Sequence, residues 1–201
     1  MNIWDFWAKK YNKLWVQKYS LTPTREYILK VFDLKRPLKI LDLGCGPGEL
    51  IEELLKRNKV IDITGLDFSE GMLNESRKKN PAAKHIQLDV KDLHKLQGNY
   101  DTIISTHSLP YWKNPKKVMK DLSNILNEDG TIYIGFASGN SLYDKLILFF
   151  VKFTTGPANY PSDANFRELI SSFFTVEDLS IIKEKKFMPR IAVYTLRKVK
   201  L

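Results

Sequence analysis

The fold of this chain is decided by one stretch, Lys39-Ile40-Leu41-Asp42-Leu43-Gly44-Cys45-Gly46-Pro47-Gly48. Its first half is an apolar run of strand length, typical of a parallel strand that is buried on both faces. Its glycines remove side chains where the backbone turns sharply or where a ligand approaches closely. Pro47 suits the first position of the helix that follows. A strand, a glycine turn and a helix in this order predict a nucleotide-binding crevice.

The spacing of the glycines indicates which kind of nucleotide the turn accepts. A turn that binds the pyrophosphate of a dinucleotide has the pattern G-x-G-x-x-G/A, whereas Gly44, Gly46 and Gly48 follow G-x-G-x-G. Glu49 stands three positions after Gly46, and its carboxylate would repel a pyrophosphate at the start of the helix. Both departures disfavour an NAD-dependent oxidoreductase. Asp42, directly before the turn, is suited to attract an ammonium group of a ligand.

A second acidic residue follows the next predicted strand, which covers residues 60–66. Asp67 lies 21 positions beyond Gly46, close to the distance at which an acidic residue grips the hydroxyls of a ribose. Its two carboxylate oxygens can each accept a hydrogen bond from one hydroxyl. The alternative task of capping a helix is filled equally well by Ser69. Asp67 is therefore the predicted ribose-binding residue.

Both regions resemble a known family. Residues 42–48 are similar to motif I of the class I S-adenosylmethionine-dependent methyltransferases, and residues 66–73 resemble the second motif of that family. The resemblance implies S-adenosyl-L-methionine as the cofactor, S-adenosyl-L-homocysteine as the product, and the small-molecule branch that includes ubiquinone/menaquinone-type methyltransferases. The cofactor-binding residues that it implies here are Gly44, Cys45 and Gly46 with Asp42 before them, Asp67 on the ribose, and Phe68 and Met72 on the adenine.

Two more cofactor contacts are implied after the third predicted strand, which covers residues 83–88. By resemblance, Asp89 accepts a hydrogen bond from the exocyclic amine of the adenine, and Val90 offers its backbone N–H to the ring. Ser105 ends the fourth predicted strand, residues 100–105. We expect it on the cofactor too, because ligands bind at the carboxyl ends of strands in open α/β sheets.

Transfer of a methyl group requires little covalent chemistry from the protein itself. The methyl group of a sulfonium is already activated, so an in-line displacement needs mainly binding and orientation. A general base is useful only if the acceptor arrives protonated. His107 is the candidate base, because the usual pKa of histidine, about 6.5, lies near neutrality. The alternative is that His107 only lines the site.

Residues 1–20 are rich in aromatic side chains. Trp4, Trp7, Tyr11 and Leu14 recur at helical spacing, which predicts one amphipathic helix with an aromatic face. Such a helix either docks on the core or forms a lid over cofactor and substrate, and the family resemblance favours the lid. Tyr11 is the candidate catalytic or pocket residue of this segment.

Residues 137–165 form a substrate-side insertion between the fifth predicted strand and the final elements. The run from Leu142 to Phe153 predicts a strongly apolar helix. A wide face buried against the core is the favoured interpretation. The alternatives are a wall for an apolar substrate, or a weak contact with a membrane surface, with Lys145 and Lys152 at the rim.

The order of these elements predicts an α/β fold. We expect a Rossmann-like, doubly wound sheet of seven strands, mostly parallel, with an antiparallel last strand and helices on both faces. Residues 174–182 and 187–196 form its closing antiparallel pair. A length of 201 residues suits a single methyltransferase domain that covers the whole chain, 1–201.

Composition narrows the partners and the compartment. The net charge of +9 comes mainly from dispersed lysines, which favours a solvated surface over a nucleic-acid face. The single cysteine rules out an internal disulfide, and with no recognisable signal peptide we expect a cytoplasmic protein. The longest apolar run, 146–151, is too short to cross a bilayer. Three scattered histidines argue against a metal site.

We therefore predict a methyltransferase that acts on a small, partly apolar acceptor molecule. Cys45 lies inside the cofactor loop, which excludes a covalent attack by cysteine on a pyrimidine base. The basic charge keeps an RNA-modifying methyltransferase open as an alternative. A non-catalytic module that binds S-adenosylmethionine is the other alternative.

Overall fold

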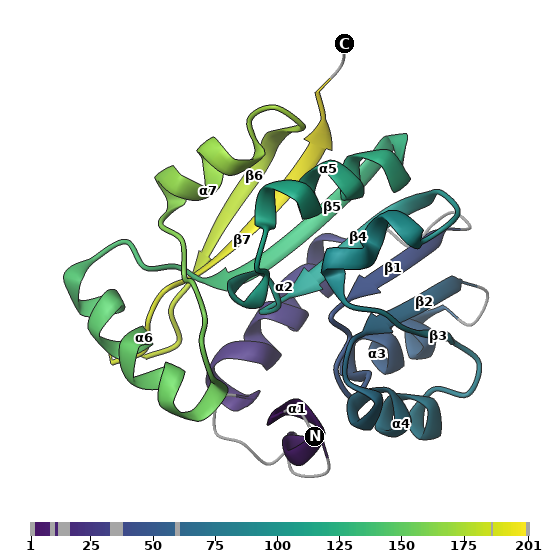
Figure 1. Ribbon diagram of the computed structural model, residues 1–201, viewed down its shortest axis with the longest axis horizontal. Coiled ribbons are helices and arrows are strands. Elements are labelled where there is room, and N and C mark those ends of the chain that lie inside the picture. The colour runs from purple at the N-terminus through teal and green to yellow at the C-terminus, as the bar shows by residue number, and fades with distance from the viewer. Residues whose placement is uncertain are drawn as a thin grey trace.

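The computed structural model describes residues 3–8, 11, 17–32, 38–58, 61–185 and 187–199. Within these ranges seven strands form one sheet, in the order β3-β2-β1-β4-β5-β7-β6 (Figure 1). They are β1 Lys39–Leu43, β2 Asp62–Asp67, β3 Lys84–Gln87, β4 Tyr100–Thr106, β5 Leu126–Ala137, β6 Phe174–Ile182 and β7 Ile191–Lys198. β7 pairs antiparallel with both β5 and β6, and the other pairings are parallel. The predicted Rossmann-like sheet with an antiparallel last strand is confirmed.

Helices cover both faces of the sheet, and each face has its own apolar core. They are α1 Ile3–Trp7, α2 Thr22–Val31, α3 Glu49–Arg57, α4 Glu70–Lys79, α5 Pro115–Ile125, α6 Leu142–Thr155 and α7 Asp163–Ile170, with the shorter turns η2 Gln17–Leu21, η3 Val90–Lys95 and η4 Leu109–Tyr111. β1 divides its side chains between the two cores. Ile40 packs in the core of α2 and α3, whereas Leu41 and Leu43 pack in the core of α5 and α7.

β1 lies inside the sheet next to the central strand β4, and the strand order reverses between these two strands. It pairs with β2 on one side and with β4 on the other. At its end, the backbone N–H groups of Gly44 and Cys45 both donate to the carbonyl of Leu66, at 2.7 and 3.0 Å. The glycine loop is thereby fixed to the end of β2. Gly48, with a φ of +79°, precedes the first residue of α3, so the prediction that Pro47 opens this helix is wrong.

The aromatic spacing predicts one helix over residues 1–20, but the N-terminal segment does not form one. α1 ends after five residues, and Leu14 lies outside the described part of the chain. Asp5 holds α1 in place, because its Oδ1 accepts hydrogen bonds from Ser69 Oγ at 2.6 Å and from the N–H of Gly71 at 3.0 Å. A negative charge at the N-terminus of α4 is electrostatically favourable. This polar contact, and not a long aromatic stripe, positions the segment.

The interpretation that α6 buries a wide face against the core is wrong. Leu148 is 3% exposed and packs inward, whereas Leu142, Leu146 and Phe153 are 86%, 54% and 74% exposed. α6 follows β5 beyond the carboxyl end of the sheet, and Figure 1 shows it at the periphery of the molecule. A helix in this position meets the rest of the protein along one stripe only. None of the described helices is long and apolar enough to cross a membrane.

Candidate active site

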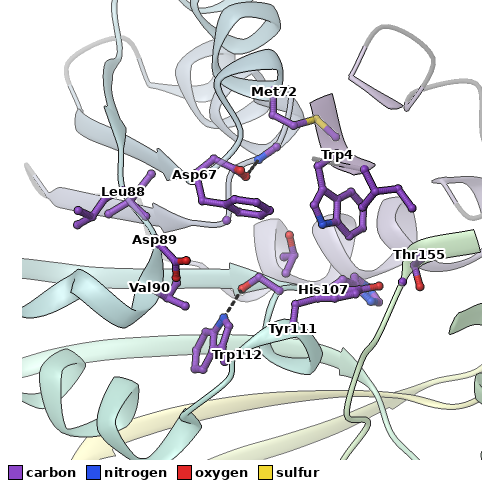
Figure 2. A pocket seen from close by; sticks show the side chains of 18 of the residues that line it. Trp4, Asp67, Met72, Leu88, Asp89, Val90, His107, Tyr111, Trp112 and Thr155 are labelled. Atoms are coloured by element: carbon purple, nitrogen blue, oxygen red, sulfur yellow. Dashed lines mark hydrogen bonds between the residues drawn. The ribbon is translucent and has the colours of Figure 1, made fainter. Parts of the chain in front are cut away.

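A cavity of about 360 Å³ opens at the carboxyl ends of β1, β2 and β4 (Figure 2). This is the edge at which open α/β sheets bind their ligands. Its walls come from segments far apart in the sequence. They include Ile3, Trp4 and Tyr11, then Gly44 and Gly46, then Asp67, Phe68 and Met72, then Leu88, Asp89 and Val90, then Thr106, His107, Ser108, Tyr111 and Trp112, and finally Thr155, Gly156 and Pro157. Most of the residues singled out from the sequence therefore lie around one cavity.

Asp67 joins the glycine loop to the start of α4. Its Oδ2 accepts a hydrogen bond from the N–H of Gly46 at 2.9 Å, and its Oδ1 accepts one from the N–H of Ser69 at 2.9 Å. Ser69 is the N-cap of α4, as its sequence position suggests. Burial raises the pKa of Asp67, and the N–H donors oppose that shift. A carboxylate has about four acceptor positions, more than these backbone donors fill, so Asp67 can still accept a hydrogen bond from a ligand in the cavity.

A mixed apolar and polar wall lies next to Asp67. Figure 2 shows Leu88, Asp89 and Val90 on one side of the cavity, with Trp4 and Thr155 across from them. Asp89 caps η3 through its Oδ1, which accepts a hydrogen bond from the N–H of Lys91 at 3.0 Å. The wall therefore combines the apolar side chains of Leu88 and Val90 with the carboxylate of Asp89.

A smaller recess of about 40 Å³ lies beneath the glycine loop, lined by residues that include Asp42 and Arg25. Asp42 is 1% exposed, and among the described residues neither of its carboxylate oxygens has a hydrogen-bond partner. Burial raises the pKa of Asp42 to about 7, with a further contribution from the charge of Asp67. A buried carboxylate without a partner is costly in the free energy of folding. Such a group is suited to a cationic ligand.

Arg25 is a site residue that the sequence analysis misses. It is 9% exposed, donates a hydrogen bond from Nη2 to Thr22 Oγ1 at 3.0 Å, and its Nε lies 3.5 Å from Glu53 Oε1. The available signal is its place in α2, three residues before the buried Ile28. A charged residue on the buried stripe of a helix is unusual unless its charge is paired with another group. Here it brings a guanidinium to the recess that holds Asp42.

Like Asp42, two further predicted cofactor residues do not line the larger cavity. Cys45 is 8% exposed, lines the recess, and donates its thiol hydrogen to the carbonyl of Gly46 at 3.6 Å. Ser105 is 1% exposed, and its Oγ lies 2.6 Å from the Oγ of Ser108. Ser108 forms the cavity wall at this point, so it stands between Ser105 and any ligand. The structure therefore brings Ser108, and not the predicted Ser105, to the wall of the cavity.

His107 lines the cavity with an unusual backbone and an unusual pKa. Its φ is +58°, in the left-handed region, and its N–H donates to the carbonyl of Gly135 at 2.7 Å. Burial lowers the pKa of the imidazole to about 4. An efficient general base has a pKa near the working pH. This shift disfavours the predicted base and favours the alternative that His107 lines and orients the site.

Aromatic rings close the remaining side of the cavity. The ring of Trp4 meets Tyr111 edge-on at 5.1 Å and Tyr11 at 6.1 Å. Burial raises the pKa values of both tyrosines, so their hydroxyls stay protonated near neutral pH. Thr155, at the end of α6, adds to the wall. The insertion thus contributes Thr155, Gly156 and Pro157 to the cavity wall, while Ile3 and Trp4 of α1 line it from the N-terminal side.

Sequence comparison relates this chain to methyltransferases. A family model described as "Methyltransferase domain" matches residues 15–180. Over 106 residues the chain is 29% identical to a ubiquinone/menaquinone biosynthesis C-methyltransferase of Campylobacter jejuni, which covers 50% of this chain and 45% of that protein. The chain therefore spans about half the length, or less, of the curated relatives that it matches.

Solved structures share the fold. Magnesium protoporphyrin IX methyltransferase from Synechocystis PCC 6803, with bound SAH, has a TM-score of 0.67 and 19% identity, over 88% of this chain and 81% of that chain. A chain of the complex between the Haloferax volcanii Trm112 methyltransferase activator and the putative methyltransferase has a TM-score of 0.80 and 16% identity, over 98% of each chain. At these identities the likeness concerns the fold alone.

Proposed function

Because the chain belongs to the methyltransferase domain family, we propose that it binds S-adenosylmethionine in the cavity described above. It transfers the methyl group by in-line displacement to a small, partly apolar acceptor. The cofactor supplies an activated methyl group on a sulfonium. The protein supplies binding, orientation and a site from which water is excluded.

The observation that carries this proposal is the unpartnered carboxylate of Asp42 in the recess beside Arg25. The amino-acid end of S-adenosylmethionine carries an ammonium and a carboxylate. The carboxylate of Asp42 has the opposite charge to the ligand's ammonium. The guanidinium of Arg25 has the opposite charge to the ligand's carboxylate. Gly46 adds to the fit, because a Cβ built on it meets no atom within 4 Å. The loop therefore leaves open space where a ligand is to pass.

The nucleoside end has matching groups in the larger cavity. The carboxylate of Asp67 is available to the ribose hydroxyls, with Phe68 and Met72 beside it. Asp89 and Val90 supply an acceptor and a backbone N–H at the adenine position. The acceptor molecule occupies the remaining space, between Trp4, Tyr11, Tyr111 and His107. These aromatic walls favour an acceptor that is partly apolar.

Small-molecule enzymes among the curated relatives, such as trans-aconitate 2-methyltransferase of Enterobacter, support a small acceptor over RNA. The distribution of charge agrees with this choice. Many lysines are paired with carboxylates, including Lys56, Lys78, Lys79, Lys84, Lys95, Lys117 and Lys198. Lysines that are paired and dispersed attract the phosphates of a nucleic acid less strongly than a clustered basic patch does. The cytoplasmic location stays a prediction.

Calorimetric titration with S-adenosylhomocysteine and with adenosine tests the two ends of the site separately. Asp67→Ala weakens both ligands by about 1.5–3 kcal/mol, the range for hydrogen bonds to a charged group. Asp42→Asn weakens S-adenosylhomocysteine by a similar amount and leaves adenosine unchanged, because adenosine has no ammonium. NAD serves as the control ligand. Equal affinity of S-adenosylhomocysteine for the parent and for both variants contradicts the proposed site.

Turnover is measured with labelled S-adenosylmethionine, a panel of small apolar acceptors, and RNA. Transfer to a small acceptor supports the proposal. Transfer to RNA alone replaces it with the RNA-modifying alternative. Tight cofactor binding without transfer to any acceptor supports the non-catalytic module instead.

A further inference from the structure

α6 carries a broad apolar surface that the protein itself does not cover. The exposed fractions are 86% for Leu142, 43% for Tyr143, 54% for Leu146, 55% for Phe149, 58% for Phe150 and 74% for Phe153. The inward stripe of the helix is formed by Asp144 and Leu148, four residues apart. The apolar side chains lie opposite that stripe. α6 is therefore apolar on the side that points away from the core.

The exposed rings form a continuous cluster. Phe149 lies 5.8 Å from Phe150 and 5.4 Å from Phe153 between ring centroids. Tyr143 extends the cluster, because its hydroxyl donates to the carbonyl of Phe187 at 3.0 Å, and Phe187 is itself 57% exposed. We call these residues, with Leu142, Leu146 and Phe150, the α6 face. Contiguous apolar surfaces of this kind on soluble proteins mark interaction sites.

Lysines border the α6 face on two sides. Lys145 and Lys152 are exposed and lie seven residues apart, on one flank of the helix. On the other flank, Lys183 Nζ lies 5.8 Å from the centroid of the Tyr143 ring, and Lys185 is exposed nearby in sequence. Glu184 is an exposed acidic residue in the same loop. The balance at the rim is clearly positive.

The helix carries little negative charge of its own. Asp144, the acidic residue of α6, is 3% exposed and accepts hydrogen bonds from the hydroxyl of Ser141 at 2.6 Å and from the N–H of Arg190 at 3.3 Å. Its charge faces the protein. An apolar, aromatic centre with a lysine rim is the composition of helices that lie in the interface of a lipid bilayer. Lysine stems can also cover apolar surface while the ammonium groups reach outward.

We propose that the α6 face is a docking surface for a bilayer that contains anionic lipids. The helix lies parallel to the membrane, its phenylalanines enter the boundary between headgroups and acyl chains, and Lys145, Lys152 and Lys183 contact anionic headgroups. A second copy of this chain is a poorer occupant, because face-to-face contact would bring lysine rims of the same sign together. Thr155 lies at the end of α6 and lines the cavity, so the bound bilayer lies beside the candidate active site.

Vesicle sedimentation of the full chain tests the proposal. We expect binding to phosphatidylcholine vesicles that contain phosphatidylglycerol, weaker binding to phosphatidylcholine alone, and a decrease as salt is raised. Phe149→Ser with Phe153→Ser removes the binding. Lys145→Gln with Lys152→Gln lowers the partition coefficient to anionic vesicles at least tenfold, since each lysine near an anionic surface contributes about fivefold.

Matched controls distinguish the effect of the α6 face from a general loss of apolar surface or of positive charge. Val31→Ser changes an exposed apolar residue on α2, and Lys116→Gln with Lys120→Gln removes a similar pair of exposed lysines from α5. Both controls bind vesicles as the parent does. All variants retain the thermal unfolding midpoint and the affinity for S-adenosylhomocysteine, so failure of the docking surface is distinguishable from failure of the cofactor site.

Three results overturn the proposal. The first is absence of vesicle binding by the parent. The second is vesicle binding that does not respond to the phenylalanine and lysine substitutions on α6. The third is a concentration-dependent dimer in sedimentation velocity that the phenylalanine substitutions abolish, which identifies a second copy of the chain as the occupant.

Discussion

Thr24 Oγ1 lies 3.0 Å from Nε2 of His107, the histidine that lines the cavity. Thr24 Oγ1 also lies 2.7 Å from the carbonyl of Ser20, to which it donates its one hydroxyl hydrogen. The hydroxyl is therefore the acceptor toward the imidazole, and Nε2 carries the hydrogen. This assignment leaves Nδ1 as the acceptor nitrogen of a neutral ring.

His107→Asn tests whether this neutral ring takes a proton. Asparagine tolerates the left-handed backbone at this position better than alanine does, so the fold is kept. Because the pKa of His107 is lowered to about 4, the ring is already neutral at pH 5, and we expect no acid limb in kcat near pH 6.5. The variant then loses less than about tenfold in kcat. A loss of about 10²–10⁴-fold, the contribution of a general base, would restore the catalytic assignment.

Asp42→Asn tests the cost of the buried carboxylate. The pKa of Asp42 is raised from 3.8 to about 7, so between these values the folded protein holds more protons than the unfolded chain. The free energy of unfolding of the parent therefore falls as pH rises from about 4 to about 7. We expect the variant to be more stable than the parent at pH 8, by roughly 2 kcal/mol or more, and to have no advantage at pH 4.

Denaturant unfolding at both pH values gives the free energy of unfolding of the variant and of the parent. The titration of other groups cancels when one value is subtracted from the other. The same substitution weakens S-adenosylhomocysteine, so stability and binding change in opposite directions. A variant that is less stable than the parent at pH 8 contradicts the assignment of an uncompensated charge.

Gly44 and Gly46 respond differently to alanine. A Cβ on Gly44 lies 2.6 Å from the Cβ of Ser108, whereas a Cβ on Gly46 meets nothing within 4 Å. Both have positive φ, which costs alanine about 1–2 kcal/mol. Gly44→Ala adds a steric clash of about 1–3 kcal/mol and lowers the unfolding midpoint further. Gly46→Ala keeps most of the stability but weakens S-adenosylhomocysteine at least tenfold, as measured by calorimetry and thermal unfolding. If both variants lose the same affinity for S-adenosylhomocysteine and have the same unfolding midpoint, the two glycines do not have different roles.

Asp5→Ala tests whether α1 retains the ligand. The substitution removes the acceptor for Ser69 Oγ and for the N–H of Gly71, which hold α1 over the cavity. We expect the dissociation rate of S-adenosylhomocysteine to rise about tenfold, the factor for about 1.4 kcal/mol. Stopped-flow tryptophan fluorescence gives this rate. Glu70→Gln is the matched control, since Glu70 lies in the same turn and pairs with the half-buried Arg77. An equal change in both variants means that α1 is not the retaining element.

The fold could be read from the sequence because its signals are local. A strand of apolar residues followed by glycines fixes β1 and the loop, and Asp67 follows β2 at the distance that a ribose site needs. The capping of α4 by Ser69 is a local signal of the same kind. These predictions depend on neighbours within one element, so a single sequence contains them.

The remaining features depend on contacts between distant segments. α6 has apolar residues on more than one of its faces, so periodicity alone cannot decide which stripe packs inward. Arg25 belongs to no motif, and its importance appears only when α2 is placed against the glycine loop. Ser105 lies in β4 and Ser108 directly after it, and only the path of the backbone decides which hydroxyl meets the cavity.

Cys45 gives the molecule a native reporter of its own motion. It is the one cysteine of the chain, it is 8% exposed under the glycine loop, and burial raises the pKa of its thiol. Because the thiolate is the species that reacts with alkylating reagents, the closed loop protects it almost completely. Its labelling rate therefore measures how often the loop opens, without any introduced probe. A ligand held by the loop slows that rate in proportion to the time it keeps the loop closed.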